Sequence, residues 1–362
     1  MTSKKDLKIS NVKGLLIILV VFGHLLEIYK DNYNELFRFI YAFHMPLFIF
    51  VSGFLAKRMR VSKIVNLVLL YLIFQTFFNW VLHLTGDYPN LQFTYGEPHF
   101  HLWYIVSLGF WYGVALIINK FDLQVSGKWI VFLVLCLISF ISRWYTDDIV
   151  DGVNVFYDNF SSYTLSYQRT LSFMPFFFMG FFMNKKAVQS MYHSIGNVNV
   201  AITIFVVTMF LTFLYIQNVP GTESMFRGSH GVPKIMGDAE GFFSYSIRVA
   251  FHYFIAFWLI YLIFNITTST ENILTKWGDH SLTIFLFHPV VVFILRQTEF
   301  MEEWDPFSQI AFFLIVTICV SYVLGSSTFT KATKYFCNPY PTLKTFTDKL
   351  FYPIKTNKGI ES

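Results

Sequence analysis

Three ionisable residues interrupt one apolar stretch near the N-terminus. Lys13, His24 and Glu27 lie within VKGLLIILVVFGHLLEIY, residues 12–29. Eleven residues are close to three helical turns, so Lys13 and His24 share a face about 16 Å apart along the axis, and Glu27 lies beside His24 on that face. An imidazole beside a carboxylate suits general-base catalysis. Ionisable groups at membrane depth are costly, which favours a functional site over a histidine that only packs.

Two further histidines each stand just before a proline in an apolar segment. His44 belongs to FHMPLFIFVSGF, residues 43–54, and His288 to SLTIFLFHPVV, residues 281–291. The prolines predict a helix break beside each histidine. His44 therefore either faces the same cavity as His24 or hydrogen-bonds a carbonyl that Pro46 frees. In the first motif, Ser52 and Gly53 predict close helix packing.

Aromatic and cationic residues collect at the ends of other apolar segments. Such residues suit stacking on a sugar ring or binding an anion, while the simpler alternative is an aromatic girdle with cations that reach the headgroups. A long loop at residues 221–241 adds a candidate lid or carbohydrate-facing surface, with a plain connector as the alternative. The substrate-binding candidates are His44, Trp103, Arg169, Arg248, His252 and His288.

A cation cluster, KRMRVSK, follows at residues 57–63. With Lys13, its Arg58, Arg60 and Lys63 are candidates for the phosphates of a nucleotide-like cofactor. The alternative is a topology signal in contact with anionic lipids.

Composition defines the class of protein. Hydrophobic residues make up 55% of the 362-residue chain and charged residues 14%, with a mean hydropathy of +0.51, so we expect an all-α polytopic membrane protein. The net charge of +5 is spread in short groups between apolar segments, which argues against nucleic acid as a partner. No metal-ligand motif is present, and we expect no metal. Ten apolar windows predict about ten transmembrane helices, at residues 12–29, 36–56, 64–83, 100–119, 128–145, 170–183, 198–216, 247–266, 282–295 and 310–329.

The charged loops predict the orientation. With the N-terminus inside, 18 of the 27 Lys and Arg residues fall in inner segments and eight in outer ones. The positive-inside rule then places both the N- and C-termini in the cytosol. Lys13 lies at the cytosolic end of the first helix, and His24 with Glu27 lies toward the outside.

Taken together, these motifs resemble the acyltransferase 3 family of integral-membrane O-acyltransferases, particularly compact members similar to fucose 4-O-acetylase. The resemblance rests on Lys13 with ten residues before His24, FHMPLFIFVSGF, HLWYIVSLGF, MPFFFMGFFM and SLTIFLFHPVV. It implies ten core helices, acetyl-CoA or another acyl-CoA as the cytosolic donor, and acylation of a glycan presented at the membrane, often on its outer side. By position, His24 matches the essential histidine of the family. Lys13 stands where the family usually has arginine, which keeps the charge and loses the bidentate fork.

The resemblance implies a transmembrane acyltransferase domain over residues 1–335 and a short basic cytosolic tail over 336–362. His24, Glu27 and Lys13 become the catalytic candidates, with His24 either a general base or an acyl carrier. The expected partners are membrane lipids and a glycan acceptor of capsule, exopolysaccharide or teichoic acid type. A homo-oligomer is left open, and the expected location is the bacterial plasma membrane, with multiple passes. The competing class is a secondary transporter for an anionic or carbohydrate solute.

Overall fold

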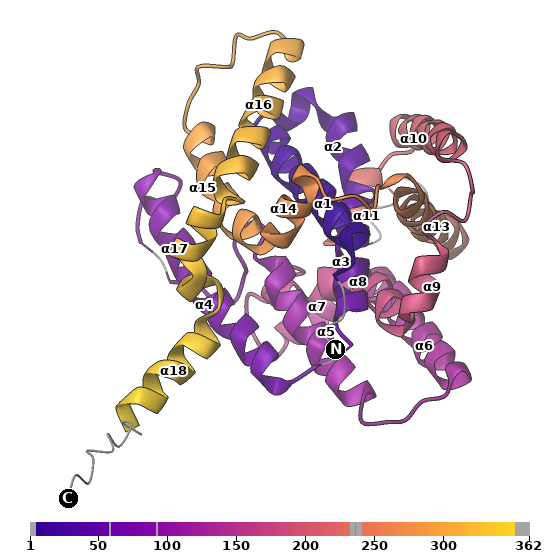
Figure 1. Cartoon of the computed structure of the whole chain (residues 1–362), viewed down its shortest axis with the longest axis horizontal. Coiled ribbons are helices and arrows are strands. Elements are labelled where there is room, and N and C mark those ends of the chain that lie inside the picture. Colours follow the sequence, from indigo (N-terminus) through magenta and orange to yellow (C-terminus); the bar gives the residue numbers. More distant parts are fainter. Residues whose placement is uncertain (1–4, 58, 92, 232–235, 237–240, 352–362) are drawn as a thin grey trace, which may run out of the picture.

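The computed structural model describes residues 5–57, 59–91, 93–231, 236 and 241–351, and all the regular structure within them is helical. This confirms the all-α prediction. Figure 1 shows the first helix, α1 (Leu7–Leu26), near the middle of the molecule, with elements from the rest of the chain around it. Arg58, one of the predicted cofactor-binding residues, lies outside the described residues.

Helix α1 is buried because its middle, residues 14–23, is apolar on all sides. The Asp6 side chain caps its start by accepting a hydrogen bond from the Ile9 N–H (3.4 Å), and Val12, Leu16 and Ile17 are fully buried. It packs against helices drawn from both ends of the sequence. These are α3 (His44–Leu55), α14 (Ile273–Asp279), α15 (Ser281–Arg296) and α16 (Pro306–Leu324).

Glycines let two pairs of helices approach closely. A Cβ at Gly14 of α1 would overlap the backbone of Leu274 in α14. Likewise, a Cβ at Gly53 of α3 would overlap the backbone of Phe177 in α8 (Tyr167–Phe182), and one at Gly180 would overlap Phe50. The close packing predicted from Gly53 is confirmed, and the backbones around the first helix are held at short range.

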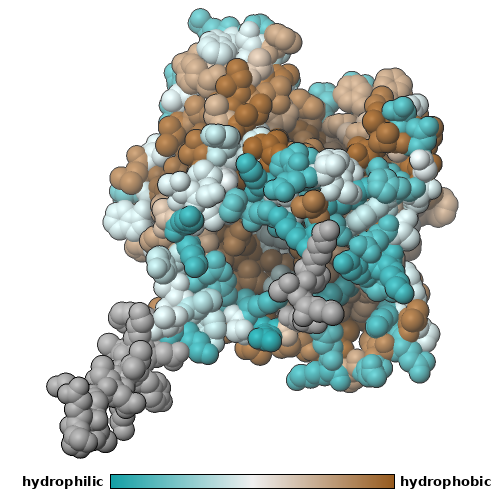
Figure 2. Space-filling view, viewed as in Figure 1, coloured by the Kyte–Doolittle hydropathy of each residue, from teal (hydrophilic) through white to brown (hydrophobic). Residues whose placement is uncertain are grey.

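The outer helices expose apolar side chains, as a lipid-facing layer requires. About a fifth of the most apolar window is buried in α6 (Val125–Trp144, 22%) and α10 (Val198–Asn218, 17%), against 72% in the span that contains α1. Figure 2 shows hydrophilic residues across the middle and lower part of one face and hydrophobic residues over its upper part. The remaining long helices are α4 (Val61–Leu84), α5 (Trp103–Ile118) and α13 (Phe242–Ile266).

The helices are those of a multi-pass membrane protein. Within the described residues, seven are long and apolar enough to cross a membrane, and there are eight if the bent pair α14 and α15, which meet at 85°, forms one span. Each of the ten predicted segments coincides with a helix or helix pair, although α5 and α8 have only 16 residues each. The count of ten spans stays a prediction.

Short elements connect the long ones and build both ends of the molecule. Toward the predicted outside are η1 (Glu27–Asn32), α2 (Asn34–Tyr41), α7 (Thr146–Asn154), η2 (Thr164–Ser166) and α11 (Thr222–Arg227). The others are α9 (Lys185–Ser190), α17 (Ser327–Cys337) and α18 (Pro339–Phe351).

Neither proline breaks its helix at the predicted place. The chain bends at Ala42 and Phe43, between α2 and α3, and Pro46 lies in the first turn of α3, where a proline needs no hydrogen-bond acceptor. Helix α15 continues through Pro289. His44 and His288 therefore both lie in helices that continue through the following proline.

Candidate active site

Two cavities lie at opposite ends of α1. The outer cavity, named for the predicted orientation, has a volume of about 210 Å³ and the inner cavity about 460 Å³. The outer cavity is lined by His24, Glu27, Tyr41, His44, Met45, Pro98, Phe100, Trp103, Tyr163, Arg169, Phe173, Phe226 and Arg227. The inner cavity is lined by Lys5, Asp6, Ile9, Ser10, Lys13, Phe54, Leu55, Lys57, Lys185 and Asp279.

His24 and Glu27 form a hydrogen-bonded pair in the outer cavity. The last turn of α1 carries His24, and Glu27 is the first residue of η1, which keeps the two side chains on one side. The distance from His24 Nδ1 to Glu27 Oε2 is 3.0 Å, and the two side chains are 12% and 14% exposed. A neutral imidazole donates its Nδ1–H to this carboxylate and keeps a lone pair on Nε2. That lone pair is available to accept a proton.

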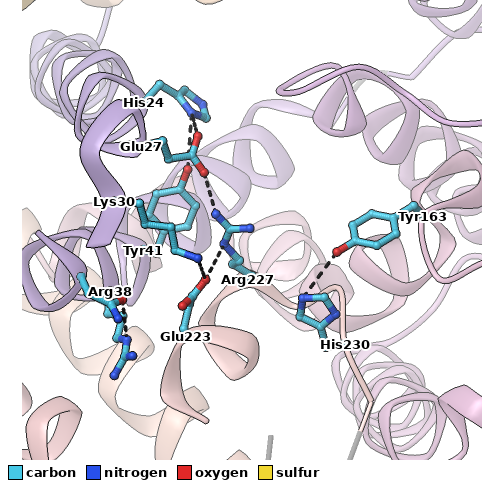
Figure 3. Close-up of polar contacts among 10 residues, drawn as sticks. His24, Glu27, Lys30, Arg38, Tyr41, Tyr163, Glu223, Arg227 and His230 are labelled. Carbon is cyan, nitrogen blue, oxygen red and sulfur yellow. Dashed lines mark hydrogen bonds and ion pairs between the residues drawn. The ribbon is translucent and has the colours of Figure 1, made fainter. Parts of the chain in front are cut away.

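Arg227 of α11 holds the other oxygen of the Glu27 carboxylate. Its Nη2 lies 2.7 Å from Glu27 Oε1, and its Nε lies 3.4 Å from Glu223, which also pairs with Lys30 at 2.5 Å (Figure 3). The Tyr41 hydroxyl is 3.4 Å from His24 Nδ1. A chain of alternating charges therefore links the end of the first helix to the long loop after α10.

A second wall of the outer cavity is aromatic and cationic. The guanidinium of Arg169, in the first turn of α8, lies 5.2 Å from the Trp103 ring centroid and 5.8 Å from that of Tyr163. Phe100 contacts His24, with 4.3 Å between ring centroids. Trp103 and Arg169 thus face the same cavity as His24. From the sequence alone, these two residues could equally belong to an aromatic girdle and its headgroup-binding cations.

His44 and His288, the two histidines closely followed by a proline, both lie near the His24 end of α1. His44 lines the cavity and donates from Nδ1 to the Ile40 carbonyl oxygen at 2.7 Å. His288 is buried and stacks on His24, with ring centroids 5.4 Å apart and 23° between the planes. Its Nδ1 lies 3.0 Å from the Ile284 carbonyl oxygen. These backbone bonds fix both rings.

Three predicted substrate residues lie outside the lining of the outer cavity. His288 is buried behind His24, and the other two lie in α13. His252 is buried in α13 behind Phe226, with 4.9 Å between ring centroids. Arg248, one turn earlier, donates from Nη1 to the Pro220 carbonyl oxygen at 3.0 Å. Both contact residues of the loop after α10, so they support that loop instead of lining the cavity.

The inner cavity collects four lysines from three parts of the chain. Lys13 lies there with Lys5, Lys57 and Lys185. The carboxylate of Asp279 pairs with Lys5 and accepts a hydrogen bond from Ser10 Oγ (3.1 Å). Lys57 Nζ donates to the Gly180 carbonyl oxygen at 3.0 Å, at the end of α8. Four lysines around one space suit a ligand with several phosphates.

The predicted cofactor residues do not all reach this cavity. Arg60 is the N-terminal cap of α4, and Lys63 lines a separate cavity with Tyr112 and Asn338. Only Lys13 of the described candidates lies in the inner cavity. Among the described residues, no three His, Cys, Asp or Glu side chains are grouped closely enough to hold a metal ion.

Sequence reasoning missed several lining residues. Arg227 lies in the long loop at residues 221–241, but nothing in the sequence of that loop indicates that it reaches Glu27. Lys57 belongs to the cation cluster at residues 57–63, of which the sequence predicts only Arg58, Arg60 and Lys63 as cofactor ligands. For Tyr41, Tyr163 and Lys185, their lining roles depend on how distant helices pack, and no local pattern marks them.

The fold and these two cavities define a multi-pass helical membrane protein with a histidine and carboxylate pair toward one side and a lysine-rich cavity toward the other. The sequence model of the acyltransferase 3 family, described as an acyltransferase domain, matches residues 6–326. The chain belongs to this family.

Two relatives are similar over a short stretch. Nodulation protein NolL of Sinorhizobium fredii (strain NBRC 101917 / NGR234) is 52% identical over 61 residues, which are 15% of this chain and 17% of that protein. Nodulation protein NolL of Mesorhizobium japonicum (strain LMG 29417 / CECT 9101 / MAFF 303099) is 44% identical over 62 residues, 16% of this chain and 17% of that protein. The chain thus matches about a sixth of the length of these relatives. No solved structure matches the chain significantly.

Proposed function

We propose that this protein is a membrane O-acyltransferase that moves an acetyl group from acetyl-CoA, bound in the inner cavity, to a hydroxyl of a glycan in the outer cavity. The observation that carries the proposal is the His24 and Glu27 pair, 3.0 Å apart in the wall of the outer cavity. Membership of the acyltransferase 3 family supports acyl transfer over solute transport.

His24 is the general base of the proposed reaction. Its Nε2 takes the proton of the acceptor hydroxyl as the oxygen attacks the thioester carbonyl. The carbon–sulfur bond then breaks, and the proton passes from His24 to the departing thiolate of CoA, so that no net proton is released. Glu27 keeps the imidazole in the tautomer that accepts at Nε2 and stabilises the imidazolium that forms.

The inner cavity is the proposed donor site. Lys5, Lys13, Lys57 and Lys185 supply positive charge for the phosphates of acetyl-CoA. Lys13 and His24 are about 16 Å apart along the helix axis, and the extended pantetheine arm of CoA is long enough to carry the thioester toward His24. Leu16, Val20 and Val21, which lie between the two ends of α1, are buried, so the arm has to pass beside a packed helix.

The outer cavity is the proposed acceptor site. Trp103, Tyr163 and Phe100 line it and offer faces for the apolar side of a sugar ring. A glycan of the cell envelope would enter from the outer face, which agrees with the predicted orientation in a bacterial plasma membrane.

Replacing His24 by Ala tests the proposal. We expect His24→Ala to lower acetyl transfer by about 100-fold or more, because general-base catalysis contributes on this order. The measurement is the O-acetyl content of surface glycan by NMR, in cells lacking the native protein and carrying either form.

The matched control is His83→Ala, since His83 also lies near the predicted outer side. Its Nδ1 lies 3.1 Å from the Tyr88 carbonyl oxygen, and its side chain does not line the cavity. Normal acetylation by a well-inserted His24→Ala protein would sink the assignment. Solute uptake into liposomes without any acetyl transfer would favour the transporter alternative.

A further inference from the structure

Arg169 places a guanidinium in the outer cavity without forming an ion pair with any described carboxylate. The one carboxylate in the cavity lining, Glu27, is already held by His24 and Arg227. Within the part of the chain that the structure describes, Arg169 makes neither a hydrogen bond nor an ion pair, and its guanidinium lies over the Trp103 and Tyr163 rings. Its five N–H donors are therefore available to a ligand.

The position of Arg169 adds two further costs. It lies in the first turn of α8, where the helix dipole disfavours a positive charge. The guanidinium of Arg227 lines the same small cavity and repels it. A partly buried cation that is destabilised by the helix dipole and by a second cation is stabilised when an anion binds beside it.

The surrounding structure orients this guanidinium. The two aromatic rings hold it, as cation–π contacts do. Just before α8, Leu165 and Ser166 both adopt left-handed backbone angles (φ 46° and 53°), and the Leu165 N–H donates to the Gly96 carbonyl oxygen at 2.6 Å. Left-handed backbone at non-glycine residues is strained and persists where other contacts fix it. The entry into α8 is thus tied to the loop that carries Pro98 and Phe100 into the cavity.

We propose that Arg169 binds an anionic group of the acceptor, either a carboxylate of the sugar or a phosphate attached to it, so that the substrate class is an acidic glycan. This inference rests on the proposed function. The planar fork of arginine pairs with the two oxygens of such a group. The phosphates of the donor are assigned to the inner cavity, at the far end of α1, so they do not account for the cation here.

The test is ligand binding to the full-length protein in detergent, without acetyl-CoA. The probes are methyl glucuronide, glucose 1-phosphate and methyl glucoside, compared at equal ionic strength by the rise in melting temperature. We expect one of the two anionic sugars to reach half of its maximal effect at a concentration at least about ten-fold lower than the neutral glucoside. A preference for methyl glucuronide would identify the anionic group as a sugar carboxylate, and a preference for glucose 1-phosphate would identify it as a phosphate.

Variants connect the effect to Arg169. Arg169→Gln should abolish the preference for the anionic sugar. Arg169→Lys keeps the charge and loses the fork, so it should weaken the preference, and it serves as the test if the Gln variant does not fold. Arg248→Gln is the matched control, because Arg248 lies outside the cavity lining, and it should keep the preference.

Equal stabilisation by the glucoside, no stabilisation by any probe, or an unchanged preference in Arg169→Gln would each overturn the inference. Because no acetyl-CoA is used, these results are separate from those of the His24 test. If the enzyme acetylated only a neutral glycan, the proposed function would stand and the inference about Arg169 would be wrong.

Discussion

Glu27 serves two partners with its two oxygens. Oε2 accepts from His24, and Oε1 pairs with Arg227. A carboxylate held at both oxygens cannot rotate away from the imidazole, so Arg227 is a positioning residue that acts through Glu27. Arg227 itself is steadied over the Phe37 and Tyr41 rings, at 5.1 and 5.9 Å from the ring centroids.

Arg227→Gln should lower kcat by roughly 10- to 100-fold, because small displacements of a catalytic group are this costly. The KM for acetyl-CoA should stay unchanged, since Arg227 lies in the outer cavity. Arg227→Lys should recover part of the rate. The measurement is steady-state acetyl transfer by purified protein.

Arg38→Gln is the control, because Arg38 bonds Asn34 (2.9 Å) on the same outer side without lining the cavity. If kcat were unchanged in Arg227→Gln, the ion pair with Glu27 would have no part in orienting His24.

At the residue scale, local spacing predicted the contact between His24 and Glu27, because helix geometry alone brings residues three apart together. Arg227 comes 200 residues later, and no spacing rule could link it to Glu27. The cation cluster shows the same limit. Lys57 lies just after α3 and reaches the end of α8, whereas Lys63 has entered α4 and points to another cavity.

At the element scale, the packing of α3 on α8 holds His44 and Arg169 on facing helices. Gly53→Ala and Gly180→Ala should each lower the free energy of unfolding by about 1–3 kcal/mol, the usual cost of overpacking. The physical reason is that each new Cβ would overlap the backbone of the facing helix. Thermal unfolding in detergent, followed by circular dichroism, measures the change.

Gly109→Ala and Gly113→Ala in α5 are matched controls, because a Cβ at either position meets no atom within 4 Å. Alanine in place of a glycine within a helix is favourable by itself, so these two proteins should melt no earlier than the native one. Equal destabilisation at all four glycines would contradict the role of close packing between α3 and α8.

The sequence predicted where the helices lie better than how they end or bend. The ten apolar windows fall on helices because burial and lipid both select continuous apolar runs. The windows did not show that the first span leads into a 3₁₀ helix at Glu27, or that α14 turns by 85° into α15. Those bends depend on contacts with distant segments.

At the scale of the whole molecule, the two cavities should open to opposite sides of the membrane. Cysteines introduced at Tyr163 and Lys185 lie in the outer and inner cavities, respectively. In a protein whose Cys136, Cys319 and Cys337 are replaced by alanine, an impermeant maleimide should label position 163 in intact cells and position 185 only in inverted vesicles. This follows from the positive-inside rule.

Labelling of both positions from one side would contradict the predicted orientation and the proposal of a donor inside and an acceptor outside. The distribution of cations gave this orientation from sequence, and the structure adds the testable positions.

The inner end of α1 has a consequence for the order of assembly. Lys8 donates to the Phe264 carbonyl oxygen (2.8 Å), and Asn11 donates to those of Thr268 (2.9 Å) and Thr270 (2.8 Å). Polar groups without partners are costly in a membrane. Helix α1 therefore finds these hydrogen-bond partners only after some 260 further residues have been synthesised and inserted. Until then, we expect the polar side chains of α1 to be bound by other groups, such as those of the insertion machinery. In a chain truncated before residue 264 they would have no native partners, and we expect membrane proteases to degrade such a chain.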